Sequence, residues 1–213
     1  MKKARLMLAA AAAGLLLAGC SGGGKSSFSP DRSSVYVTDD GELKSALVLE
    51  TDEKAGKEEL KQFLEEAVNR FNEKNGSGDD GENVPVALDS CTVENGRMTA
   101  VFDYRSAEDL IAFRQSDENE DNSNTFTSIE VKSASEAGTS GWFSEDLVKP
   151  DGSEVSGLDA AKTQKALAVS VQGGGILETE GAVICMSRGV ETLSDTAVSV
   201  PEGQTTLIVF EAK

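Results

Sequence analysis

The residues with the clearest chemical pattern lie near the N-terminus. Residues 19–26 spell Gly-Cys-Ser-Gly-Gly-Gly-Lys-Ser, which matches the G-x-x-x-x-G-K-S pattern of a phosphate-binding loop. Such a loop needs a strand before its glycines and a helix at its Lys-Ser pair, so that backbone N–H groups surround the phosphate. Residues 26–34 are instead rich in serine, include a proline and have no helical periodicity. The sequence therefore predicts neither a nucleotide site nor a nucleotide cofactor here.

Catalytic side chains are hard to find in the rest of the chain. The sequence contains no histidine, which excludes Ser-His-Asp and Cys-His catalysis and His-containing zinc sites. Beyond residue 23 it also lacks the G-x-S-x-G pattern of serine hydrolases, and the S-x-x-K pattern is absent throughout. With 37 acidic residues, a two-carboxylate hydrolase stays open, but no spacing singles out a pair. We therefore predict no catalytic, cofactor-binding or metal-binding residue.

An acidic stretch at residues 117–124 raises the question of calcium. Asp117, Asn119 and Asp121 occupy alternate positions, as the ligands of an EF-hand loop do. However, Asn122 stands where that loop needs glycine, and Ser128 where it needs glutamate. A solvated loop is the preferred interpretation, with calcium binding as the alternative.

Aromatic and thiol side chains leave two further alternatives. Trp142 and Phe143 are adjacent in a Gly/Ser-rich region, and they either stack on a sugar ring or peptide or plug the edge of a core. We prefer the plug. Cys91 and Cys185 lie among apolar neighbours in predicted strands, as a disulfide or as two buried thiols. Free thiols are slightly preferred.

Elements that would position these residues can be predicted from hydrophobic spacing. A long amphipathic helix is expected at about 56–75 and a short one, capped by Ser106, at about 107–115. The pair Asn95-Gly96 predicts a tight hairpin with Val93 opposite Met98, which leaves Asp103 facing outward. Strands are expected at residues 35–37, 46–49, 91–94, 97–100, 126–131, 167–171, 182–186, 197–200 and 207–210.

These elements define the predicted fold class. We expect an α+β domain with antiparallel sheet, one long helix, one short helix and a β-rich C-terminal half. The domain would cover residues 35–213, with subdomains at 35–116 and 125–213 as the alternative.

An export signal precedes this domain. Lys2, Lys3 and Arg5 form a basic start, and the apolar run at residues 6–18 is shorter than the about 20 residues that span a bilayer. The run ends in Leu17-Ala18-Gly19-Cys20. This order of features resembles the signal peptides of bacterial lipoproteins. The resemblance implies that a lipid is attached to the Cys20 thiol and that residues 1–19 are removed by cleavage before Cys20.

The rest of the chain, with its Ser/Gly tether, is similar in general sequence character to small uncharacterised lipoproteins of Gram-positive anaerobes. That resemblance implies a location on the outer face of the cytoplasmic membrane, or the outer membrane in a Gram-negative source. Residues 20–34 would carry the lipid and form a Gly/Ser-rich tether. Because cleavage removes three positive charges, the net charge of −17 would become −20.

Charge and location frame the functional hypotheses. A surface this acidic repels nucleic acid, so no nucleic-acid partner is expected. Our first hypothesis is a lipid-anchored, non-catalytic binding domain for an envelope protein, peptide or glycan. The alternative is a histidine-free, carboxylate-based hydrolase that acts on cell-envelope or extracellular glycan. A two-lobed solute receptor is disfavoured because the chain of 213 residues is short for one.

Overall fold

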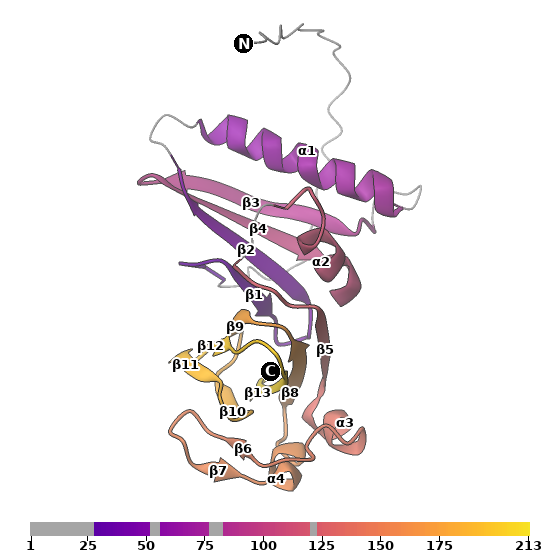
Figure 1. Cartoon of the computed structure of the whole chain (residues 1–213), viewed down its shortest axis with the longest axis vertical. Coiled ribbons are helices and arrows are strands. Elements are labelled where there is room, and N and C mark those ends of the chain that lie inside the picture. Colours follow the sequence, from indigo (N-terminus) through magenta and orange to yellow (C-terminus); the bar gives the residue numbers. More distant parts are fainter. Residues whose placement is uncertain (1–27, 52–55, 77–82, 120–122) are drawn as a thin grey trace, which may run out of the picture.

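A computed structural model of the chain describes residues 28–51, 56–76, 83–119 and 123–213. These residues form four helices and thirteen strands, which are arranged in two mostly antiparallel sheets (Figure 1). The prediction of a β-rich fold that combines helices with antiparallel sheets is thereby confirmed. The predicted signal peptide and Cys20 lie outside the described residues.

Two sheets organise the fold, and we name them A and B. Sheet A has seven strands, in this order across the sheet: β11 (Glu191–Ser194), β12 (Ala197–Val200), β9 (Gly175–Thr179), β1 (Ser34–Val37), β2 (Leu43–Glu50), β4 (Arg97–Tyr104) and β3 (Val86–Glu94). Sheet B has six strands: β5 (Ser128–Ser133), β8 (Ala166–Gln172), β13 (Thr205–Glu211), β10 (Val183–Met186), β6 (Leu147–Val148) and β7 (Glu154–Val155). The chain alternates between the sheets from β8 to β13, so each sheet is completed only by the last strands.

Along the molecule's long axis, the first of the four helices lies near one end, the second near the middle and the last two near the other end (Figure 1). They are α1 (Lys57–Asn75), α2 (Ala107–Arg114), α3 (Ala134–Thr139) and α4 (Gly157–Ala161). The first two accompany sheet A, and the last two pack against each other beside sheet B. Among the described residues, no helix combines the length and the hydrophobicity that crossing a bilayer requires.

Helix α1 packs against β3 through the C-terminal two thirds of its length. Leu64, Val68 and Phe71 are buried, but Phe63, which the spacing places on the same apolar stripe, is 52% exposed. Asn72 is buried instead, and its side-chain amide donates to the Val86 carbonyl at 2.8 Å while its oxygen accepts from the Val86 N–H at 3.1 Å. A polar side chain thus satisfies the backbone where the edge strand β3 begins.

The β3–β4 hairpin matches the sequence prediction at its turn. Asn95 and Gly96 both have positive φ, at 52° and 74°, and Val93 is paired with Met98. Both strands continue well beyond the predicted residues, and β3 stays paired with β4 on both sides of a bulge between Leu88 and Ser90. Asp103 lies on the outer face of sheet A, as expected, and its carboxylate is 2.8 Å from the Lys44 ammonium.

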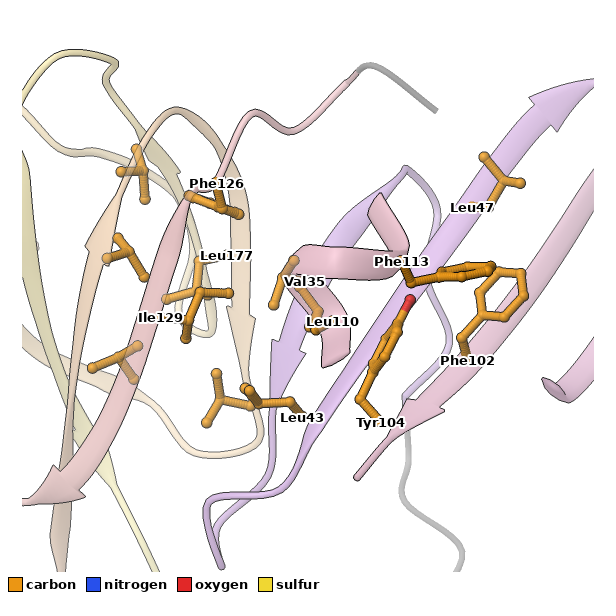
Figure 2. Close-up of a cluster of buried hydrophobic side chains, with 14 of the residues drawn as sticks. Val35, Leu43, Leu47, Phe102, Tyr104, Leu110, Phe113, Phe126, Ile129 and Leu177 are labelled. Atoms are coloured by element: carbon orange, nitrogen blue, oxygen red, sulfur yellow. The ribbon is translucent and has the colours of Figure 1, made fainter. Parts of the chain in front are cut away.

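The main hydrophobic cluster joins the two sheets through α2. Ser106 caps this helix by accepting from the Asp109 N–H at 3.1 Å, so the predicted cap is confirmed. Leu110 and Phe113 are buried beside side chains from both sheets (Figure 2). The Phe113 ring lies 5.5 Å from Phe102 and 6.2 Å from Tyr104, between ring centroids.

Sheet A contains strands from both sides of the predicted 116/125 boundary. β1 pairs in parallel with β9, with Val35 opposite Leu177. The main cluster likewise includes residues from both parts. Because neither part completes sheet A by itself, the two stretches share one sheet and one core.

Residues 28–33 lie against the outer face of sheet A, although the sequence assigns them to a tether. The Phe28 ring stacks on Tyr36 with centroids 4.2 Å apart. The Ser33 hydroxyl donates to the Val48 carbonyl at 3.3 Å and accepts from the Val48 N–H at 2.9 Å. We call residues 28–33 the N-terminal strap. They cover part of a sheet face that would otherwise meet water.

Candidate functional site

A small hollow lies on the outer face of sheet B. It has a volume of about 260 Å³, and three other grooves in the described part of the chain have volumes of about 610–740 Å³. We call it the Trp142 hollow. Its lining is Trp142, Ser144, Glu145, Asp146, Leu147, Ser170, Ser187, Arg188, Thr205 and Leu207.

The floor of the hollow comes from the central strands β8 and β13. In β8, Val169 and Val171 are buried toward sheet A, so Ser170 between them faces outward. Ser170 is paired with Leu207 of β13, and two residues further on Gln172 donates to the Thr205 hydroxyl at 3.1 Å. The floor therefore alternates hydroxyl and apolar side chains.

Both floor strands have a hydrogen-bonded neighbour on each side. Their backbone N–H and C=O groups are used in the ladders of the sheet. A ligand in the hollow consequently meets side chains and not a free strand edge.

One wall is the loop between α3 and β6. A capping box starts α3, because Ser133 accepts from the Glu136 N–H while the Glu136 carboxylate accepts from the Ser133 N–H at 3.1 Å. The loop is then fixed at both ends. The backbone N–H of Trp142 donates to the Ala137 carbonyl at 3.0 Å, and the Leu147 side chain is only 2% exposed.

Trp142 itself is partly buried against a second hydrophobic cluster, which lies beneath α3 and α4. The Lys132 ammonium lies 4.6 Å from the centroid of its ring and 2.7 Å from the Glu130 carboxylate. Such a cation near an indole is attractive and helps to fix the ring. Trp142 thus serves as the edge plug that the sequence favoured, and at the same time it lines the hollow.

The opposite wall is the turn after β10. The Ser187 N–H donates to the Leu207 carbonyl at 2.8 Å, and its hydroxyl accepts from the Leu207 N–H at 2.9 Å. Arg188 follows, and its guanidinium pairs with the Glu154 carboxylate of β7. The positive charge in the hollow therefore already has a partner.

Two carboxylates in the hollow have no such partner. Glu145 and Asp146 are exposed, and their side chains make no hydrogen bond or ion pair within the described part of the chain. Together with the hydroxyls of the floor and the indole of the wall, they offer acceptors and an apolar surface to a small polar ligand.

The acidic loop at residues 117–124, for which calcium binding is the alternative interpretation, is described only in part, because Asp121 lies outside the described residues. Glu118 within it accepts from the Arg70 Nε at 2.8 Å and from the Lys74 Nζ at 2.9 Å. These two cations hold the pKa of Glu118 below its usual value. Among the residues with a described position, no group of three or more His, Cys, Asp or Glu is arranged to hold a metal ion.

The two cysteines of the domain are free thiols in the structure. Cys91 belongs to the main cluster and Cys185 to the cluster beneath α3 and α4. Burial raises the pKa of Cys185 to about 11 and also raises that of Cys91. Both thiols act as small apolar side chains.

Several lining residues were missed by the sequence analysis. Ser170 could have been found, since it is the one outward polar position between two buried valines. Ser187, Arg188 and Thr205 have no local signal, because only the pairing of β10 with β13 brings them together.

A comparison with protein-family models, curated proteins and solved structures finds no match for this chain.

Proposed function

We propose that this chain is a lipid-anchored extracytoplasmic protein whose domain binds a glycan in the Trp142 hollow without chemical change. The observation that carries the proposal is the convergence of an indole with hydroxyl, carboxylate and guanidinium side chains around one small hollow. Sugar rings offer apolar C–H faces to an aromatic ring and hydroxyls to polar side chains.

A glycan fits this site better than an extended peptide does. Peptides that bind sheets usually add a strand to an open edge and use backbone hydrogen bonds. The hollow lies instead on the face of β8 and β13, where the backbone is already paired on both sides. Recognition must therefore come from side chains, as it does for small polar ligands.

The lipid anchor belongs to the same proposal. We place it on Cys20, at the outer face of the cytoplasmic membrane, or at the outer membrane if the source is Gram-negative. Cys20 precedes Phe28 by eight positions, which corresponds to at most about 29 Å of extended chain. Since the strap contacts sheet A, the anchor would hold that side toward the membrane and leave the outer face of sheet B to the envelope.

We treat α1 as an amphipathic packing helix in this scheme and not as a membrane-surface helix. Leu64, Val68 and Phe71 are buried against the domain. Its first turn exposes Glu58 and Glu59, which an anionic bilayer surface would repel.

A carboxylate-based hydrolase is the second candidate, because Glu145 and Asp146 line the same hollow as Trp142. In that case, an oligosaccharide incubated with the protein would release new reducing ends, and Glu145→Gln or Asp146→Asn would abolish the release. Binding without any release supports the non-catalytic proposal.

The test of binding is calorimetric titration of the acylated protein with soluble envelope oligosaccharides. We expect Trp142→Ala to weaken binding by about tenfold or more, because one aromatic contact at a ligand site contributes on the order of 1–2 kcal/mol. Phe63→Ala, an exposed aromatic on α1, serves as the matched control and should leave binding unchanged. Equal binding by wild type and Trp142→Ala would contradict the proposed site, and a mass spectrum without lipid on Cys20 would contradict the anchor.

A further inference from the structure

We infer that the Trp142 hollow selects glycans that carry a primary ammonium group, such as unacetylated amino sugars. This inference rests on the proposed function and names the class of glycan. It follows from the balance of charges around the hollow.

Only some of the charged side chains around the hollow remain available to a ligand. Arg188 is the cation in the lining, and its guanidinium is paired with Glu154. Glu145 and Asp146 are the carboxylates in the lining, and neither has a side-chain partner within the described residues. A ligand therefore meets two unpaired negative charges and one positive charge that is already compensated.

The two unpaired carboxylates favour an ammonium group over a neutral donor. A hydrogen bond from an ammonium to a carboxylate is about twice as strong as one between neutral groups. An N-acetylated sugar has an amide in place of the ammonium and forms only the weaker kind. An acidic sugar is repelled both by Glu145 and Asp146 and by the surrounding protein, whose net charge would be −20 after cleavage of the signal peptide.

The indole of Trp142 also favours a cationic group. The Lys132 ammonium already lies 4.6 Å from the centre of the Trp142 ring, so this side chain accepts a cation in the folded protein. Indole is the most favourable aromatic group for such contacts. An ammonium bound between the Trp142 ring and the carboxylates of Glu145 and Asp146 would be attracted by both.

The remaining lining explains why the ligand should be a sugar and not a simple amine. Ser144, Ser170, Ser187 and Thr205 place four hydroxyl side chains around the same hollow. Hydroxyls both donate and accept, so they match the hydroxyls of a sugar ring. A simple amine would leave the Ser144 and Ser170 hydroxyls unused, which make no hydrogen bond within the described residues.

The experiment compares a β-1,4-linked glucosamine tetrasaccharide with its fully N-acetylated counterpart. Both are titrated into the acylated protein in zwitterionic nanodiscs, with Trp142 fluorescence as the signal because the chain has a single tryptophan. We expect the glucosamine tetrasaccharide to bind about tenfold more tightly. The double variant E145Q/D146N should reduce this preference to about threefold or less.

A matched control separates the hollow from the general acidity of the protein. The double variant E58Q/E59Q removes the same charge from the exposed first turn of α1 and should keep the preference. Equal affinity for both tetrasaccharides overturns the inference. A preference that E58Q/E59Q reduces as much as E145Q/D146N does also overturns it.

The outcomes distinguish this inference from the proposed function. If both tetrasaccharides bind equally and Trp142→Ala abolishes both signals by calorimetry, the glycan site stands and the ammonium selectivity is wrong. If neither tetrasaccharide nor any envelope oligosaccharide binds, both proposals are wrong.

Discussion

The outer faces of the two sheets are covered in different ways. On sheet A, the N-terminal strap crosses the face and is held by the Phe28–Tyr36 stack and the two hydrogen bonds between Ser33 and Val48. On sheet B, α3 and α4 form a packed layer that shares a cluster with Ala168, Val209 and the strands β6 and β7 at one edge of the sheet. The first cover is a single chain segment, whereas the second is a small layer of the domain.

This difference indicates where a ligand site can form. The layer over sheet B ends at Trp142, before it reaches Ser170 and Thr205, and the uncovered floor becomes the hollow. A rigid layer with a defined edge can hold side chains in place for binding. We therefore expect loss of the layer to affect the protein more than loss of strap contacts.

The largest effect is expected for Leu147→Ala. This side chain is 2% exposed within the cluster beneath α3 and α4, and its truncation should lower the free energy of unfolding by about 2–5 kcal/mol. Leu158→Ala makes the same change at a side chain that is 65% exposed in α4, and should cost less than about 0.5 kcal/mol. Denaturant unfolding measures both, and similar losses for the two variants would mean that the layer is not packed as described.

A smaller loss is expected for Phe28→Ala in the strap. Phe28 is only partly buried, so removal of its stack on Tyr36 should cost about 1–2 kcal/mol. The same unfolding measurement applies, with Phe63→Ala as the control on an exposed aromatic. A loss as large as that of Leu147→Ala would remove the contrast between the two covers.

Lys132→Met tests the contact at the edge of the layer. Loss of the cation from the Trp142 ring should cost about 0.5–1 kcal/mol, and Lys132→Arg should keep most of the stability because arginine also binds aromatic faces. Thermal unfolding of the two variants gives the comparison. If both variants lose the same stability, the ring contact does not contribute.

The smallest effect concerns the ion pairs that tie α1 to the turn after α2. Because Arg70 and Lys74 lower the pKa of Glu118, its stabilisation is present above its ordinary pKa of 4.5 and is lost as pH falls through the lowered value. The Tm of wild type should exceed that of Glu118→Gln slightly at pH 7, and the difference should shrink as the pH is lowered below 4.5. A difference that stays constant as the pH falls would contradict this assignment.

The sequence predicted those elements whose cause is local. The Asn95-Gly96 pair dictates the turn of the β3–β4 hairpin through two positive φ angles, and Ser106 dictates the start of α2. Alternation also located β8, β10, β12 and β13 to within a residue or two at each end.

Elements with non-local causes were not predictable in this way. The parallel pairing of β1 with β9 joins residues about 140 positions apart, and β9 itself is short and begins at a glycine. Helices α3 and α4 are rich in Ala and Gly and have five or six residues each, too few for a hydrophobic period. The hollow depends on both features, since α3 carries Trp142 to a floor that only the completed sheet B provides.

The central claim is that a glycan occupies the hollow beside Trp142, and acrylamide quenching of the single tryptophan tests it most directly. A bound oligosaccharide would shield the indole, so saturating glucosamine tetrasaccharide should lower the quenching constant of the acylated protein in nanodiscs by about twofold or more. The account would be contradicted if calorimetry shows the tetrasaccharide bound to the protein while the quenching constant of Trp142 stays the same.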